Sequence, residues 1–313
     1  MRSLRVAFAG TPQVAVPALN AVVDSAHEVV AVLSKPDAPA GRGRSVLPSP
    51  ISVAARERGL DVHTPQSLDA SPHGALELIK NFEVDVVVVV AYGLLVPPAL
   101  LDVTEFGWVN VHFSRLPKWR GAAPVQHAIA HGDPTIGVTT FRIDAGLDTG
   151  PVLLRSPDIE ISDHEDSGHL LQRLAPIGAT LLVRTLDSLA AGVAHPTDQG
   201  DQQVSVAPRL TTAQSRIDWS MPVIDVDRWI RACTPAPGAW TTFAEHRLGI
   251  GTPAGVRVDP AAEPGAVVVE KRAVLVGARG GYCELDQVQP SGKKWMSADA
   301  WLRGLRTDER HVR

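Results

Sequence analysis

Cysteine is scarce in this 313-residue chain, which contains only Cys233 and Cys283. Two cysteines so far apart in the sequence are too few for a disulfide framework or a zinc site. The histidines are scattered without the spacing of metal ligands. We therefore expect a reduced cytoplasmic protein that holds no metal.

Long apolar runs are also missing. The longest, Val84 to Ala91, is interrupted by Asp85 and is far shorter than the roughly 20 residues that cross a bilayer. The start of the chain, MRSLRVAFAG, enters a strand pattern directly, without a long apolar segment. These features predict no membrane role.

The glycines of a dinucleotide site are missing as well. Arg5 to Gly10 reads as a buried strand, Thr11 to Val23 as a helix and Val29 to Leu33 as a second strand. This βαβ unit predicts a parallel sheet with right-handed crossovers. Only Gly10 stands at the first turn, so the G-x-G-x-x-G pattern is not formed and a dehydrogenase is disfavoured.

Length and charge predict two parts. At roughly 100 to 200 residues per domain, two domains are expected. Residues 1–208 carry 15 Lys and Arg against 22 Asp and Glu, a balance of −7, whereas residues 209–313 carry 15 against 12, a balance of +3. This asymmetry is compatible with an appended module for an anionic partner, and equally with a basic module that has none.

Val84 to Ala91, a run of β-branched residues, is typical of a central parallel strand buried on both faces. Tyr92 and Gly93 follow at its carboxyl end, where a ligand crevice is expected, although Tyr92 is equally compatible with capping the core. Further helices are predicted over residues 51–58, 72–81, 124–131 and 166–191, the last interrupted at Pro176, and strands over 136–142 and 152–156.

Ser34 to Pro50, SKPDAPAGRGRSVLPSP, is a loop by composition, because its prolines and glycines interrupt helix and strand alike. Loops longer than about 12–15 residues inside a domain are usually functional or disordered. Arg42 and Arg44 alternate with glycines and form a flexible basic strip suited to phosphates. A solvated surface loop is the alternative.

The chemistry is concentrated in Trp108 to Phe113 and in the segment AGLDTG. Side chains on a strand alternate faces, so Asn110 and His112 project from the same side. An amide beside an imidazole can polarise a carbonyl and move protons, and Asp148 supplies a carboxylate on a glycine-bounded loop. No seryl or cysteinyl nucleophile is visible among these residues. The pattern predicts acyl transfer, with a hydrogen-bonded core pair as the alternative.

Two segments, NVHFSRLPKWRGAAPVQ and DAGLDTGPVL, closely resemble the signatures of the enzymes that use 10-formyltetrahydrofolate as a formyl donor. WRGAAPVQ resembles in particular the branch of that family that formylates methionyl-initiator tRNA. The resemblance implies a Rossmann-like, parallel-sheet α/β formyltransferase domain and Asn110, His112 and Asp148 as the catalytic trio.

The resemblance also implies binding residues. The folate co-substrate would be held by Tyr92, Ser114, Arg115, Leu116, Pro117 and Asp144, and tRNA by Arg42, Arg44, Lys293 and Lys294. The chain departs from the family at two places. Arg115 stands where leucine is common, which we expect to be a surface-facing change. Val206 stands where an aromatic is common.

Formyl transfer passes through a tetrahedral intermediate with negative charge on oxygen, which Asn110 and a protonated His112 would stabilise. Asp148 is expected to hold His112 charged near neutral pH and, by resemblance, to orient it and help a water carry the proton lost by the attacking amine. That amine would be the α-amino group of methionine on tRNA, so transfer would be direct.

The C-terminal part is predicted to be a small OB-like β-barrel. Residues 192–209 are polar and rich in turns, a candidate linker between a catalytic domain over 1–191 and a tRNA-binding domain over 210–313. Short strands are expected at Ala266 to Glu270, Ala273 to Val276 and Cys283 to Val288. We expect a monomer.

Three alternatives share parts of this pattern. The hydrolase portion of 10-formyltetrahydrofolate dehydrogenase and the enzymes that formylate an amino sugar nucleotide have a similar trio and differ in the acceptor. A catalytically inactive tRNA- or folate-binding protein is the third, and the intact trio disfavours it. The segments GRGR, WRGAAPVQ and SGKKWM favour tRNA as acceptor.

Overall fold

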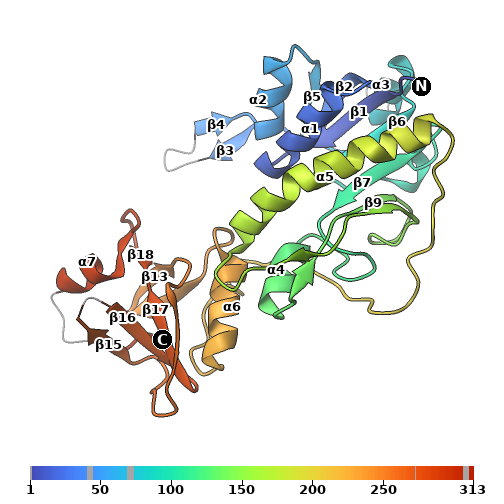
Figure 1. Cartoon of the computed structure of the whole chain (residues 1–313). Coiled ribbons are helices and arrows are strands. Elements are labelled where there is room, and N and C mark those ends of the chain that lie inside the picture. The colour runs from blue at the N-terminus through green and yellow to red at the C-terminus, as the bar shows by residue number, and fades with distance from the viewer. Residues whose placement is uncertain (1, 41–44, 69–73, 272, 306–309) are drawn as a thin grey trace. The chain divides into compact units, whose positions relative to one another are not determined.

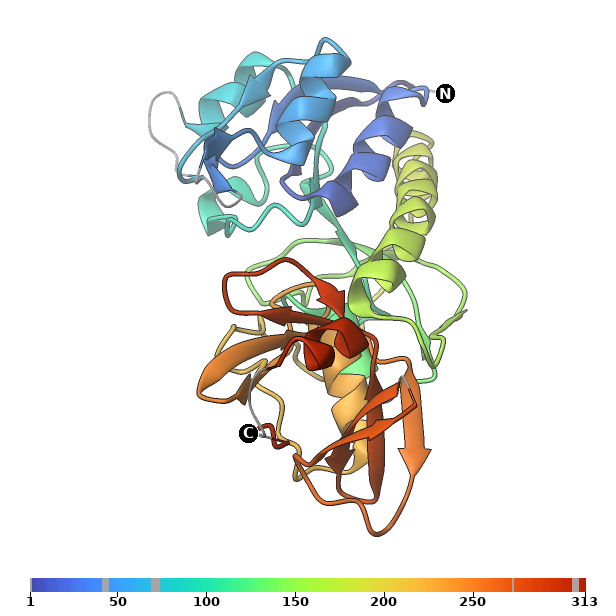
Figure 2. The same ribbon diagram turned by 90° about the vertical axis from the view of Figure 1, so that its left-hand side faces the viewer.

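The structure is a computed structural model that describes residues 2–40, 45–68, 74–271, 273–305 and 310–313 (Figures 1 and 2). It consists of two compact units. The first comprises Met1–Ala122, Gly137–Asp158 and Leu171–Val206, and the second Ala123–Ile136, Ile159–Leu170 and Ala207–Arg313.

The first unit is built on a seven-stranded sheet in the order β10-β9-β7-β6-β1-β2-β5. Its strands are β1 (Arg5–Gly10), β2 (Glu28–Leu33), β5 (Val62–His63), β6 (Val86–Val90), β7 (Trp108–His112), β9 (Thr139–Arg142) and β10 (Val152–Arg155). The neighbouring strands β5, β2, β1, β6 and β7 all pair in parallel. Strands β9 and β10 add an antiparallel edge next to β7. The predicted, mostly parallel α/β sheet is confirmed.

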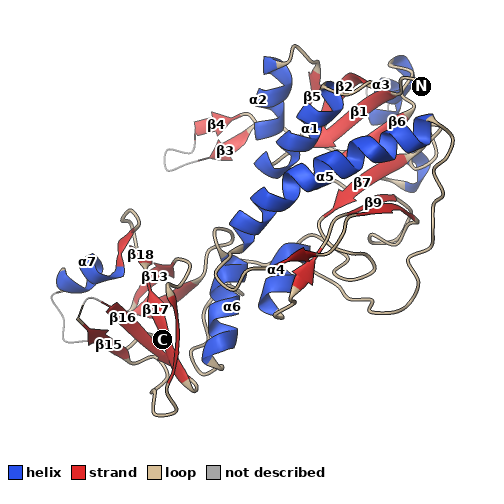
Figure 3. Cartoon of the chain, in the orientation of Figure 1, coloured by secondary structure: helices blue, strands red, loops and turns tan. Residues whose placement is uncertain are grey.

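Helices cover both faces of this sheet (Figure 3). They are α1 (Val16–Val23), α2 (Pro50–Glu57), α3 (Ala75–Asn81) and α5 (Ser167–Ala190), with short 3₁₀ turns η1 (Gln13–Ala15) and η2 (Pro98–Leu100). Residues of α3 pack with Trp108, whereas Gly178 of α5 packs on Val111. Since Trp108 and Val111 point to opposite faces of β7, α3 and α5 lie on opposite sides of the sheet.

Helix α5 continues through Pro176, where the sequence predicted an interruption. Proline removes one backbone donor and crowds the preceding turn. The burial of Leu174, Leu181, Leu182 and Leu186 along the same helix offsets this cost.

Two other segments differ from their sequence predictions. The strand predicted over residues 136–142 is split into β8 (Thr135–Ile136), which belongs to the second unit, and β9 of the first. A Cβ at Gly137, between them, would lie 2.5 Å from Cγ of Arg115, so the chain passes that side chain only as glycine. The loop predicted over residues 34–50 contains a short hairpin, β3 (Ala38–Ala40) and β4 (Ser45–Leu47).

The second unit is dominated by two antiparallel four-stranded sheets. One has the order β12-β13-β18-β19 and the other β14-β17-β16-β15. The strands are β12 (Trp240–Phe243), β13 (His246–Ile250), β14 (Gly255–Val258), β15 (Val267–Glu270), β16 (Ala273–Ala278), β17 (Gly281–Leu285), β18 (Gln287–Pro290) and β19 (Met296–Ser297). Its other elements are α4 (Pro124–Ala130), α6 (Val223–Cys233), α7 (Ala298–Arg303) and the pair β8 and β11 (Ile159–Glu160).

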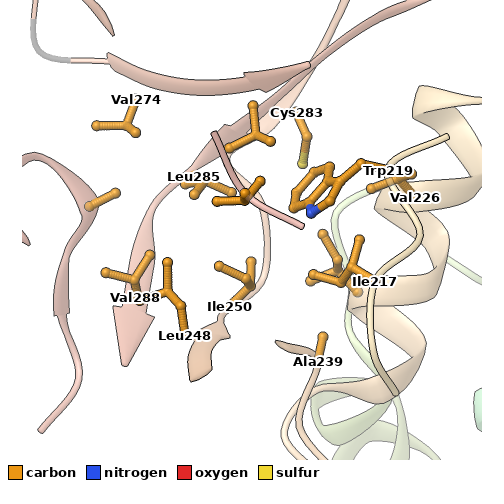
Figure 4. Packing of buried hydrophobic residues seen from close by; sticks show 14 of the residues in the cluster. Ile217, Trp219, Val226, Ala239, Leu248, Ile250, Val274, Cys283, Leu285 and Val288 are labelled. Atoms are coloured by element: carbon orange, nitrogen blue, oxygen red, sulfur yellow. The ribbon is translucent and has the colours of Figure 1, made fainter. Parts of the chain in front are cut away.

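Both sheets contribute to one core (Figure 4). Leu248 and Ile250 of one sheet and Cys283 and Leu285 of the other are buried in it, together with Trp219. The predicted C-terminal antiparallel β domain is therefore confirmed. The strand predicted over residues 283–288 is divided at Asp286, because β17 and β18 belong to different sheets.

Among the described residues, no helix is both long and apolar enough to cross a membrane.

Candidate active site

Strand β7 delivers two of the polar side chains predicted to be catalytic. His112 is its last residue and Asn110 lies two residues earlier, so both project from one face. The other face carries Val111, whose Cγ1 would lie 3.1 Å from a Cβ at Gly178 of α5. Because α5 closes that face, Asn110 and His112 project away from it.

A backbone carbonyl fixes the imidazole of His112, which is only 5% exposed. Its Nε2 lies 2.8 Å from the carbonyl oxygen of Trp119. Since a carbonyl can only accept, Nε2 carries the hydrogen and donates it. In the neutral imidazole the lone pair is therefore on Nδ1. The ring of Phe141 meets the imidazole edge-on, with centroids 6.3 Å apart.

Asp148 faces this lone pair. Its Oδ2 lies 3.7 Å from Nδ1 of His112, which is too long for a hydrogen bond and within the range of an ion pair. The same oxygen accepts a hydrogen bond of 2.7 Å from the backbone N–H of Gly121. A proton taken up at Nδ1 would therefore stand beside a fixed carboxylate.

Burial determines the resting charge of the imidazole. It lowers the pKa of His112 from the ordinary value of 6.5, and the charge of Asp148 and the hydrogen bond to Trp119 offset this effect only in part. The expectation that Asp148 holds His112 charged near neutral pH is wrong for the protein without substrate. The reason is that the ring has lost its water while the carboxylate stands beyond hydrogen-bond distance. The resting site offers a neutral proton acceptor.

The loop between β9 and β10 presents Asp148 with an unusual backbone. Its φ is +51°, in the left-handed region that non-glycine residues rarely adopt. A Cβ at Gly150 would lie 1.8 Å from the carbonyl oxygen of Arg142, so only glycine passes β9 this closely. Asp144 closes the start of the loop by accepting from the N–H of Gly146 and from Oγ1 of Thr149.

Asn110 is partly exposed at the same face. Its backbone pairs with Val89 of β6 and Phe141 of β9. Within the described part of the chain, its side-chain amide makes no hydrogen bond to another residue. The amide N–H is therefore open to a substrate oxygen.

The turn after β7 contains four of the residues predicted to bind folate. Ser114 is buried and its hydroxyl donates to a backbone carbonyl at 2.5 Å, and Leu116 is buried beside the partly buried Pro117. The Arg115 side chain is 43% exposed and its guanidinium pairs with Asp158 at 2.8 Å. The side chain of Arg115 is thus engaged at the surface.

Tyr92 lies two residues after the end of β6 and is buried, packing in a cluster with Leu100 and Trp108. Its hydroxyl has no hydrogen-bond partner among the described residues, and burial raises the pKa of Tyr92 to about 12. Trp108 shares the strand face of Asn110 and His112. Because Tyr92 packs against Trp108, it lies on the same side of the sheet as these two residues. Its raised pKa keeps the hydroxyl protonated near neutral pH.

The structure describes two of the four residues predicted to bind tRNA. Arg42 and Arg44 fall outside the described residues. Lys293 and Lys294 are exposed between β18 and β19 and belong to the second unit, whereas the trio belongs to the first.

Neither cysteine is part of the site. Cys233 and Cys283 are free, buried and in the second unit. Burial raises the pKa of the Cys233 thiol to about 12 and also raises that of Cys283. Neither is a candidate nucleophile, in agreement with the direct transfer inferred from the sequence.

Several residues around the trio were not found from the sequence. The carbonyl of Trp119 and the N–H of Gly121 are backbone groups, so no side-chain pattern indicates them. Gln199 contacts the loop of Asp148 from a segment read as a linker, and Arg120 contacts Gln199. Arg120 stands in the motif WRGAAPVQ, but the motif alone gave it no role.

Comparison with known proteins identifies the class. The model of the formyl transferase family matches residues 4–186, and the model of the formyl transferase C-terminal domain matches residues 209–306. The solved structure of WlaRD, a sugar 3N-formyl transferase in the presence of dTDP and 5-N-formyl-THF, superposes with a TM-score of 0.64 at 15% identity, covering 94% of this chain and 100% of that one. Fold, site and these matches define a formyl transferase.

Closer relatives narrow the class. A methionyl-tRNA formyltransferase of Salinispora tropica is 48% identical over 305 residues, with 97% of each chain covered. The enzyme of the same name from Mycobacteroides abscessus is 49% identical over 305 residues, covering 97% of this chain and 98% of its own. The chain belongs to the methionyl-tRNA formyltransferase family.

Proposed function

We propose that this cytoplasmic enzyme transfers the formyl group of 10-formyltetrahydrofolate to the α-amino group of methionyl-initiator tRNA. The observation that carries the proposal is the arrangement of His112. Its Nε2–H is fixed on the carbonyl of Trp119, and its Nδ1 lone pair faces Asp148. Such a group accepts a proton from an attacking amine and needs no covalent intermediate.

The reaction exchanges one amide-like bond for another. The amine nitrogen attacks the formyl carbon, a tetrahedral intermediate forms, and the bond from that carbon to N10 of the folate breaks. The amine loses one proton and N10 gains one. The amide N–H of Asn110, open at the site, would donate to the oxygen that becomes negative.

His112 and Asp148 would handle the proton. As the amine attacks, its acidic proton passes to Nδ1, directly or through a water, and the imidazolium is stabilised by the carboxylate 3.7 Å away. The proton can then pass on to N10 as the carbon–nitrogen bond breaks. Both substrates must be bound together, so proximity supplies much of the rate.

The folate would lie on the side of the sheet to which Asn110 and His112 project and on which Tyr92 is buried. The turn of Ser114, Leu116 and Pro117 and the loop closed by Asp144 border β7 and are the proposed folate contacts. Arg115, paired with Asp158, would contribute little.

The second unit would contribute tRNA contacts. We propose that residues 210–313 form a tRNA-binding domain, that Lys293 and Lys294 contact phosphates together with Arg42 and Arg44, and that the enzyme is a monomer. The family relationship and the charge balance of +3 over residues 209–313 support this role.

Competition between acceptors tests the proposal. The enzyme is supplied with 10-formyltetrahydrofolate carrying a labelled formyl group, and with methionyl-initiator tRNA, dTDP-linked amino sugar or neither. We expect label in formyl-methionyl-tRNA and little in sugar or free formate. Release of formate at the same rate without acceptor would indicate a hydrolase, and label in the sugar would indicate a sugar formyltransferase.

A further inference from the structure

The segment Thr197–Val206, predicted as part of a linker, is hydrogen-bonded to the first unit at Thr197, Gln199 and Ser205. Thr197 exchanges two backbone hydrogen bonds with Val152 of β10, at 2.8 and 2.9 Å. Further on, the carbonyl of Ser205 accepts from the N–H of Arg120 at 2.8 Å, and its hydroxyl accepts from the N–H of Trp119 at 2.9 Å. The segment therefore touches both loops that surround His112.

Gln199 joins these two loops through a single side chain. Its Nε2 donates to the carbonyls of Asp148 at 2.7 Å and Gly150 at 2.8 Å. Its Oε1 accepts from Nε and Nη2 of Arg120, at 3.0 and 2.7 Å. Both N–H groups and the oxygen of the amide are thus occupied, so Gln199 has no donor left for a substrate.

The two loops that Gln199 joins are the ones that define the catalytic geometry. One supplies the carbonyl of Trp119 to Nε2 of His112 and the N–H of Gly121 to Oδ2 of Asp148. The other carries Asp148 itself, at a φ of +51°. A residue in this backbone conformation keeps it only where its surroundings impose it. The amide of Gln199 is bonded to the carbonyl of that residue.

We propose that Gln199, together with Arg120, is a positioning residue that holds Asp148 opposite His112. It acts through the backbone of the Asp148 loop and touches no reacting atom. The inference rests on the proposed function for its kinetic consequences, whereas the geometry it concerns can be measured without any substrate.

Only an amide satisfies this site. A carboxylate at the same position keeps the contact with Arg120 and faces the carbonyls of Asp148 and Gly150 with oxygen, so it repels the loop that glutamine holds. Both Gln199→Glu and Gln199→Ala therefore remove the hydrogen bonds to the carbonyls of Asp148 and Gly150. The first replaces them with repulsion, and the second removes the side-chain amide. Gln202→Ala is the matched control, because Gln202 is an exposed glutamine of the same segment.

Kinetics give the first test. We expect Gln199→Ala and Gln199→Glu to lower kcat for formyl transfer about tenfold or more, with the KM values for folate and tRNA changed less than about threefold. In an Asp148→Asn background, Gln199→Ala should lower kcat by less than about twofold, because the residue it positions no longer acts. Gln202→Ala should have the same kcat as its parent enzyme in both backgrounds.

A substrate-free measurement separates this inference from the proposed function. NMR titration of the His112 ring should show a lower pKa in Gln199→Ala than in the wild type, since Asp148 is the only described charged side chain that raises it and would be held less closely. If the wild type fails to formylate tRNA but this shift is found, the proposed function fails and the positioning role stands.

Three results would overturn the inference: a kcat of Gln199→Ala within twofold of wild type, an equal loss in the Asp148→Asn background, or an unchanged pKa of His112. Should Gln199→Ala lower the melting temperature too far for assay, Arg120→Leu removes the two hydrogen bonds that hold Oε1 of Gln199 and so releases its amide from the other side. The same three results are then decisive for that variant.

Discussion

At the scale of single residues, the carbonyl of Trp119 determines which nitrogen of His112 is basic. It occupies the Nε2–H and leaves Nδ1 toward Asp148. A histidine held in one tautomer by a backbone group moves a proton at one defined atom. The chemistry of the site therefore depends on a peptide group that no side-chain pattern reveals.

The dependence of activity on pH follows from this arrangement. His112 must be neutral to accept a proton, and burial lowers its pKa below 6.5. We expect kcat/KM for the folate, which reports ionisations of the free enzyme, to fall to half of its plateau only below about pH 6.5, as the ring becomes protonated. Asp148→Asn should move the acid limb lower still, because the carboxylate raises the pKa. A midpoint above pH 7 in a kcat/KM profile of the wild type would contradict this account.

Arg115 offers a test of a departure from the family. Its guanidinium is paired with Asp158 at the surface, and an exposed ion pair contributes only about 0–1 kcal/mol. We expect Arg115→Leu to leave the Kd of a folate analogue, measured by calorimetry, within about threefold of wild type. A change of more than tenfold would show that the arginine acts on the folate site.

At the scale of elements, the sequence predicted best where one periodicity dominated. The valines of β6 predicted a buried strand, and the alternation along β7 predicted that Asn110 and His112 share one strand face. The loop of Asp148 was found through its glycines, but its backbone conformation follows from contacts with β9 and Gln199 that are distant in sequence.

Boundaries were wrong where tertiary contacts outweighed local patterns. Pro176 predicts a break, but the burial of the leucines of α5 keeps the helix continuous. Gly137 and Asp286 lie within apolar runs that read as single strands, whereas each run contributes to two different sheets. Val206 stands where the family commonly has an aromatic residue, and it is 61% exposed. It pairs with Arg120 in an isolated β-bridge, which is formed by main-chain groups and does not depend on the side chain.

Gly150 tests whether the β9–β10 loop positions the carboxylate. In Gly150→Ala the new Cβ would overlap the carbonyl of Arg142, a backbone atom, so the loop must move and take Asp148 with it. We expect kcat to fall about tenfold or more, and the free energy of unfolding to fall by about 1–3 kcal/mol, measured by urea denaturation. Gly255→Ala, where a Cβ meets open space, is the control and should change neither. Full activity in Gly150→Ala would show that the loop tolerates displacement.

At the scale of the whole molecule, the chain combines an α/β unit that carries the trio with a β unit that carries excess positive charge toward its end. Chain length and charge predicted two parts, with the charge balance changing from −7 over residues 1–208 to +3 over residues 209–313. The sequence did not indicate that residues 197–206 belong with the catalytic unit, because their contacts are almost all with loops distant in sequence.

The proposed tRNA contacts of the β unit predict a salt effect. Each phosphate contact contributes about one to the slope of log K against log salt concentration. The double substitution Lys293→Ala, Lys294→Ala should therefore weaken tRNA binding and lower this slope by roughly 1–2, whereas Lys80→Ala on the exposed surface of α3 should not. An unchanged slope in filter-binding titrations would place the contacts elsewhere.

The most direct test of the whole account is transfer of labelled formyl from 10-formyltetrahydrofolate to methionyl-initiator tRNA, with wild type, His112→Ala and Asp148→Ala assayed side by side and their folding checked by circular dichroism. The account predicts formyl-methionyl-tRNA from the wild type and a loss of at least about a hundredfold in both folded variants. Activity within tenfold of wild type in either variant would contradict the assigned trio, and folate turnover by the wild type without formyl-methionyl-tRNA would contradict the proposed acceptor.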